Sequence, residues 1–142
     1  MKPSLRTLAL GIALTTSLAA LAHAGGAGVR VERVKDGKYL LHSFACTGPA
    51  SFSIAATAEG VVNGERKSIP LELKAMKEPG AYQFERAWPK QGTWLVRTEM
   101  SGSHNFVTIF TLAKDGRVAG SEWVAQGNGR HECDQKLAAN AK

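Results

Sequence analysis

Residues 79–100 read PGAYQFERAWPKQGTWLVRTEM. Apolar and polar side chains alternate twice in this stretch, and a turn that contains glycine precedes each alternating run. The first run places Tyr82 and Phe84 on one face, and the second places Trp94 and Val96 on one face. Because successive side chains of a strand point to opposite faces, the pattern predicts two half-buried β-strands joined by a short connection.

The same alternation recurs on both sides of this stretch, with turn residues between the runs. Pro70 cannot donate a backbone hydrogen bond, so the run that contains it is expected at a sheet edge. The run at 104–113 is apolar on both faces, which is typical of a central strand. Strands are therefore expected at 29–34, 38–44, 51–58, 68–75, 81–88, 93–100, 104–113 and 117–124.

Seven or eight short strands separated by turns predict an all-β fold. We expect an antiparallel immunoglobulin-like β-sandwich, in which two sheets pack through their apolar faces. A helical period of convincing length is not visible in the sequence. Only residues 133–139 are expected to form a turn or two of helix.

The N-terminus has the three-part pattern of a cleavable secretory signal. Lys2 and Arg6 precede an apolar run at 8–21, and residues 22–24 read Ala-His-Ala, which signal peptidase accepts. A membrane-spanning helix needs about 20 strongly apolar residues, and this run is shorter and is interrupted by hydroxyl residues. No membrane span is therefore expected after the signal is removed.

Cleavage after Ala24 divides the chain into a signal peptide at 1–24 and a single domain at 25–142. The expected location of that domain is periplasmic or secreted. Cleavage after Ala22 is the alternative, and it would make His23 the N-terminal residue. A terminal amine beside an imidazole chelates copper, so this alternative carries a copper-binding hypothesis of its own.

The charge pattern bears on the class of partner. The formal net charge of the chain is +6 at pH 7, and it falls to +4 without the two cations of the signal peptide. Lysine and arginine alternate with glutamate instead of forming a basic stripe interleaved with aromatic residues. We therefore expect no nucleic-acid partner, and we expect an envelope protein as the partner.

Residues 79–100 also resemble a pattern found in small extracytoplasmic β-sandwich domains called YtkA-like or FixH-like. A Pro-Gly-x-Tyr strand is followed by a Gly-x-Trp-x-Val strand. The resemblance implies an immunoglobulin-like fold and a role in envelope metal handling or in the assembly of respiratory complexes. The matching residues fill turn and core positions, and fold alone does not fix function. The membrane anchor that many members carry is not expected here.

Cys46 and Cys133 are the two cysteines of the chain, and they lie near opposite ends of the mature domain. An isolated pair in an oxidising compartment most often forms a disulfide. In the chain-entropy model, closing so long a loop stabilises a fold by about 4–5 kcal/mol. We therefore predict a Cys46–Cys133 disulfide that ties the C-terminal segment to an early strand.

The cysteines also suggest a metal site as an alternative to the disulfide. In an extended chain, His42 shares a face with Cys46, and His131 shares a face with Cys133. Two thiolates and two imidazoles would suit zinc or copper(I). A disulfide would consume both sulfurs and leave the histidines as ordinary polar neighbours.

A second metal hypothesis uses Met100 and His104, which flank a Ser-Gly turn. A thioether and an imidazole on one loop could bind copper. The simpler interpretation is that Met76 and Met100 fill gaps in the apolar core.

No sequence motif for a catalytic nucleophile, a metalloprotease helix or a phosphate-binding loop occurs in the chain. The carboxylates at Glu59, Glu65, Glu72 and Glu85 are expected on outer faces or turns, in contact with solvent. We therefore expect a non-enzymatic exported module that binds an envelope component or assists its assembly. The alternative function is a periplasmic protein that binds copper or zinc.

Overall fold

The computed structural model describes residues 26–45, 52–102, 105–125 and 129–140. The predicted signal peptide at 1–24 lies outside the described residues, and so do Cys46 and His104. Within the described ranges, none of the helices has the length and apolar character needed to cross a membrane.

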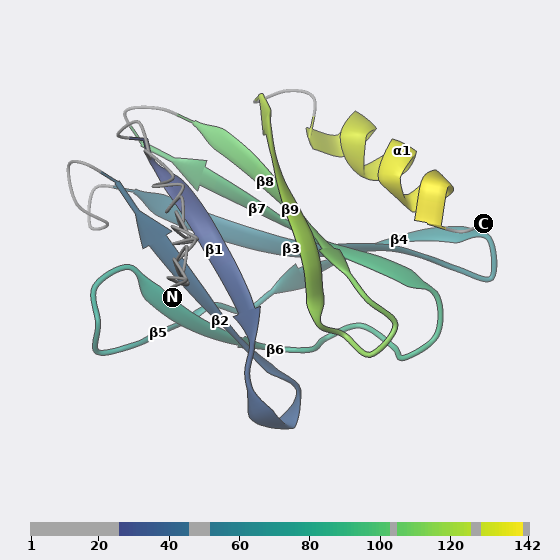
Figure 1. Cartoon of the computed structure of the whole chain (residues 1–142), viewed down its shortest axis with the longest axis horizontal. Helices are drawn as coiled ribbons and strands as arrows, with labels where there is room; N and C mark the ends of the chain where they lie inside the picture. The colour runs from purple at the N-terminus through teal and green to yellow at the C-terminus, as the bar shows by residue number, and fades with distance from the viewer. Residues whose placement is uncertain (1–25, 46–51, 103–104, 126–128, 141–142) are drawn as a thin grey trace, which may run out of the picture.

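Most of the described chain is β-strand. The elements follow the order β1 (Gly28–Arg33), η1 (Lys35–Gly37), β2 (Lys38–Phe44), β3 (Ser53–Val62), β4 (Glu65–Leu71), β5 (Lys74–Ala75), β6 (Ala81–Glu85), β7 (Thr93–Ser101), β8 (Phe106–Leu112), β9 (Val118–Ala125) and α1 (Gly129–Asn140). A four-stranded sheet has the order β1-β2-β6-β5, and a five-stranded sheet has the order β4-β3-β7-β8-β9 (Figure 1). The strand pairs of the described residues are antiparallel, so the predicted antiparallel β architecture is confirmed. The described ranges form nine strands where seven or eight were expected, and α1 makes the fold mostly β and not all-β.

The two sheets pack face to face through a core rich in aromatic residues. Tyr39 on β2 stacks on Phe84 of β6, with 5.1 Å between the ring centroids. Trp88 follows β6 and lies 5.5 Å from Tyr39 and 6.4 Å from Trp94 on β7. Aromatic pairs at such distances contribute about 0.5–1.5 kcal/mol each beyond the area they bury. This aromatic cluster therefore joins the two sheets.

A second apolar cluster lies on the other face of the five-stranded sheet, under α1 (Figure 1). Leu137 and Cys133 of the helix pack there on the strand residues Leu95, Val107, Ile109 and Val124. Strand β8 is consequently buried on both faces, because Phe110 points to the core between the sheets while Ile109 points to the helix. This confirms the central strand predicted from the run at 104–113.

Two hydrogen bonds connect the β1–β2 hairpin of the four-stranded sheet to the β8–β9 hairpin of the five-stranded sheet. The buried Tyr39 hydroxyl donates to the Gly116 carbonyl oxygen at 2.7 Å, and the Arg33 guanidinium donates to the Asp115 carbonyl oxygen. Both acceptors belong to the turn between β8 and β9. These bonds hold β1 and β9 close together at one end of the sandwich.

Candidate functional site

The predicted Cys46–Cys133 disulfide is not supported by the structure, in which Cys133 is a free thiol. The predicted disulfide would have tied the C-terminal segment to an early strand. That segment instead forms α1, which turns the Cys133 side chain inward against Leu95 and Val107 of the five-stranded sheet. Cys46 lies outside the described residues.

The two histidines of the predicted metal site lie on opposite sides of the sandwich. His131 sits on the exposed side of α1, where its Nε2 is 3.0 Å from the Gln135 side-chain amide. His42 is on the outer face of the four-stranded sheet, since its neighbour Leu41 points into the core. The helix also separates the faces of His131 and Cys133, because residues two apart in a helix do not face the same way. The structure therefore does not bring these histidines together.

The Met100 side chain is buried in the interior, as the core interpretation expected, but Met76 is 44% exposed, so the same interpretation was wrong for Met76. Its proposed copper-binding partner His104 lies outside the described residues. Over the described ranges, no three His, Cys, Asp or Glu side chains form a group that could hold a metal ion.

The environment of Cys133 disfavours thiolate chemistry. The pKa of the Cys133 thiol is raised to about 11, mainly by burial and also by the nearby Glu59 carboxylate, while Arg97 and Arg66 act in the opposite direction. The thiolate, not the thiol, is the nucleophile and the metal ligand. At neutral pH the buried sulfur is therefore protonated and behaves as an apolar group.

This pKa makes the stability of the protein depend on pH in the alkaline range. The folded-state pKa of Cys133 lies above the unperturbed value of 9.0, so the folded state binds more protons than the unfolded state between pH 9 and about 11. We expect the free energy of unfolding to fall as the pH rises through that window, and we expect Cys133 to cause no pH dependence below it, where its thiol is protonated in both states. Urea unfolding of the native protein and of Cys133→Ala across this range measures the effect. Burial also raises the pKa of Tyr39, so the difference between the two proteins is the informative quantity. Parallel pH profiles would contradict the prediction.

Glu59 was expected on a solvated face, and the structure shows that this expectation was wrong. The residue is only 4% exposed because α1 covers it. Its two carboxylate oxygens pair with Arg66 at 2.9 Å and with Arg97 at 3.2 Å. Arg66 also pairs with Asp134 of α1 at 2.7 Å. Glu59 on β3 therefore links β4 and β7, Arg66 connects this network to the helix, and both oxygens of Glu59 are already occupied by arginine partners.

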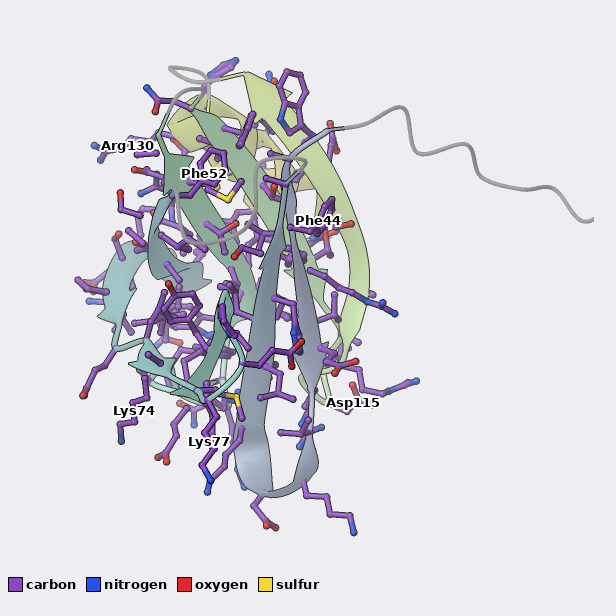
Figure 2. The ribbon with its side chains drawn as sticks, turned by 90° about the vertical axis from the view of Figure 1, so that its left-hand side faces the viewer. Phe44, Phe52, Lys74, Lys77, Asp115 and Arg130 are labelled. Atoms are coloured by element: carbon purple, nitrogen blue, oxygen red, sulfur yellow. The ribbon has the colours of Figure 1, made fainter. Side chains whose placement is uncertain are left out.

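A groove of about 480 Å³ lies between β1 and β9, the edge strands that come together on one side of the sandwich. It is lined by Val29, Arg30, Val31, Phe44, Phe110, Val118, Ala119, Gly120 and Ser121. In Figure 2 this edge of the sandwich lies on the right, with Phe44 near its upper end and Asp115 near its lower end. The hydrogen bonds that Arg33 and Tyr39 donate to the β8–β9 turn close the groove at its Asp115 end.

The backbone along this groove is available for pairing. Within the described part of the chain, β1 pairs only with β2, and β9 pairs only with β8. The two strands thus face each other across the groove without a hydrogen-bonded ladder between them. A strand edge presents unpaired N–H and C=O groups that can recruit another extended chain.

The side chains around the groove are apolar and partly exposed. Phe44 is 47% exposed at the end of β2, and Trp123 on β9 is 61% exposed. Trp123 and Ser121 share the face of β9 that looks toward the other sheet, because Ser121 is paired with the core residue Phe110. The aromatic side chain of Trp123 therefore extends the apolar wall beyond the groove itself.

Little in the sequence indicates the groove between β1 and β9. It predicted the strands, but the identity of the edge strands depends on the order of strands in each sheet. The one local signal was Gly120 in the middle of a strand, where glycine often marks an irregularity or a close backbone approach. A register irregularity does occur in the β8–β9 pair at Thr111/Leu112, opposite the start of β9.

The groove combines free backbone groups with apolar side chains, and Arg30 is the one charged residue in its lining. This chemistry suits the binding of an extended polypeptide. Comparison of the chain with protein-family models, with curated proteins and with solved structures found no match.

Proposed function

We propose that this protein is an exported, non-enzymatic module of the cell envelope that binds another protein by accepting one of its extended segments between β1 and β9. The observation that carries the proposal is the apolar groove between two edge strands whose outer backbone groups are unpaired within the described chain. The signal pattern at the N-terminus supports export to the periplasm or beyond.

An extended segment fits the groove better than a helix does. Addition of a strand to a sheet edge gains main-chain hydrogen bonds, and alternate side chains provide specificity. The inner wall is formed by Val31 and Phe110, so every second side chain of the segment would be apolar. Arg30 at the rim favours an acidic residue on the segment.

The resemblance of residues 79–100 to the YtkA-like or FixH-like domains supports an assembly role for the same groove. In that role, the module would hold a strand of an envelope component before the component joins its complex. The immunoglobulin-like topology implied by the resemblance belongs to this proposal. The observed part of it is the packing of two antiparallel sheets.

Selection from a library of displayed random peptides tests the proposal, with the mature protein as bait. We expect the selected peptides to alternate apolar and polar residues and to carry an acidic residue. In amide hydrogen exchange, a bound peptide should protect the outer edges of β1 and β9. Selected peptides that protect neither edge would contradict the proposal.

Replacement of Ser121 by tryptophan provides the matched variant. The new side chain would fill the groove from β9, and its exposed position should keep the change in unfolding free energy within about 0.5 kcal/mol. We expect this variant to bind a selected peptide about tenfold more weakly or worse, which corresponds to at least about 1.4 kcal/mol. Ser68→Trp places the same side chain on β4, the opposite edge of the same sheet, and should leave the affinity unchanged. Equal affinities of the two variants would contradict the proposed binding mode.

A further inference from the structure

A second hollow, with a volume of about 350 Å³, opens elsewhere on the molecule. It lies where the β6–β7 connection, the β8–β9 turn and the C-terminal end of α1 meet. Its lining shares no residue with the groove between β1 and β9. The volume is within the range of pockets that bind small molecules, about 300–1,000 Å³.

Three cationic side chains line this pocket, namely Arg86, Lys90 and Lys114, and no carboxylate residue lines it. Among the described residues, none of the three forms an ion pair with an aspartate or a glutamate. The pocket therefore concentrates positive charge that its own lining does not neutralise.

The Arg86 guanidinium is held in place by neutral acceptors. Its Nε donates to the Trp88 carbonyl oxygen at 3.1 Å, and its Nη2 donates to the Pro89 carbonyl oxygen at 2.8 Å. The guanidinium carbon also lies 5.7 Å from the centroid of the Trp88 ring. Because its partners carry no charge, Arg86 presents a fixed positive charge to a ligand, and little further ordering is needed on binding.

The apolar wall of the pocket is rigid. Trp88 and Trp94 are both almost fully buried and pack against each other. The indole N–H of Trp94 donates to the Gln91 carbonyl oxygen at 2.8 Å, which fixes the orientation of its ring. The hydroxyl of Thr93 and the amide of Asn140 add polar groups near the mouth. Apolar walls with a few convergent polar groups are typical of sites for small organic molecules.

We propose that this pocket binds a small organic anion. The carboxylate or phosphate oxygens of the ligand face Arg86, Lys90 and Lys114, and its carbon skeleton lies against the two tryptophans. Hydrogen bonds between charged partners are roughly twice as strong as those between neutral groups, and an anion also relieves the repulsion among the three cations. The site is independent of the peptide groove, so either proposal can fail alone.

Titrations of the mature protein followed by NMR test the proposal, with glucuronate, glucose 6-phosphate and neutral glucose as probes. We expect a saturable shift of the indole N–H signals of Trp88 and Trp94 with at least one of the two anions. Trp123 is exposed on β9 outside the pocket, so its signal should not move. Shifts with glucuronate alone, or with glucose 6-phosphate alone, would support the proposal and identify the anionic group. Raised salt should weaken the binding.

A pair of double variants supplies the control. Lys90→Gln/Lys114→Gln removes two exposed cations of the pocket and should weaken binding at least about tenfold, or about 1.4 kcal/mol. Lys74→Gln/Lys77→Gln removes two exposed lysines elsewhere (Figure 2) and should leave the affinity unchanged. The proposal is overturned if neither anion gives a saturable shift, if glucose binds as tightly, or if both double variants lose affinity equally.

Discussion

Replacement of Gly60 by alanine is expected to lower the free energy of unfolding by about 3 kcal/mol, because the added methyl group would collide with the Trp94 ring. A Cβ atom at position 60 would lie 2.3 Å from Cε3 and 2.4 Å from Cδ2 of that ring. The Trp94 ring cannot move away easily, since Trp88 packs on it and the Trp94 indole N–H donates a hydrogen bond to the Gln91 carbonyl oxygen. Overpacking of a filled core commonly costs about 1–3 kcal/mol, and the buried position of Trp94 places this case at the upper end.

Urea denaturation of both proteins measures this effect, and Gly120→Ala is the matched control. Gly120 is also a strand glycine, but a Cβ atom there would meet nothing within 4 Å. The control should change the free energy of unfolding by no more than about 0.5 kcal/mol. Trp94 also lines the cationic pocket, so Gly60→Ala should shift its indole N–H signal as well. If Gly60→Ala lowered the free energy of unfolding by no more than Gly120→Ala does, the Trp94 ring would not be held in place by Trp88 and Gln91.

The strands were predictable because their signals are local. Alternation of apolar and polar residues needs only a few neighbours, and it located both the edge strand that contains Pro70 and the doubly buried strand at 104–113. The single strand expected at 68–75 is, however, divided between β4 and β5, which belong to different sheets. The cationic pocket, by contrast, is formed by connections that lie far apart in the sequence. Arg86 follows β6 of one sheet, and Lys114 follows β8 of the other. Only the packing of the two sheets brings both residues to one pocket.

The sequence predicted only a turn or two of helix at 133–139, and the twelve-residue length of α1 was not expected because its apolar stripe is narrow. Apart from Gly129, only Cys133 and Leu137 are buried in α1, one turn apart, and the rest of the helix is polar or small. Two residues do not establish a helical period. This error affected the metal hypothesis, because an extended chain at this point placed His131 and Cys133 on one face. The burial of Glu59 follows from the same helix, so a local sequence pattern could not predict its pairing with two arginines either.

Replacement of Leu137 by alanine is expected to cost about 3 kcal/mol of unfolding free energy, within the 2–5 kcal/mol typical of buried leucines. Leu137 is 1% exposed and packs in the cluster between α1 and the five-stranded sheet. Two exposed ion pairs also attach the helix, namely Asp134 with Arg66 and Lys136 with Glu122 of β9, in which the carboxylate side chains are 52% and 54% exposed. An ion pair exposed to this extent contributes about 1 kcal/mol at most. The apolar contact should therefore dominate the docking of the helix.

The comparison of Leu137→Ala with Asp134→Asn decides between the apolar contact and the ion pair next to Glu59, and Gln135→Ala reports the effect of truncating an exposed side chain of the same helix. Unfolding in urea gives the stabilities, and the rate at which Cys133 reacts with a thiol reagent gives the position of the helix under native conditions. We expect Leu137→Ala alone to speed this reaction markedly, because a loosened helix exposes the sulfur that it now buries. If Asp134→Asn were the more costly change, the helix would be held mainly by the charges around Glu59. The burial of Leu137 and Cys133 would then be a consequence of that attachment instead of its cause.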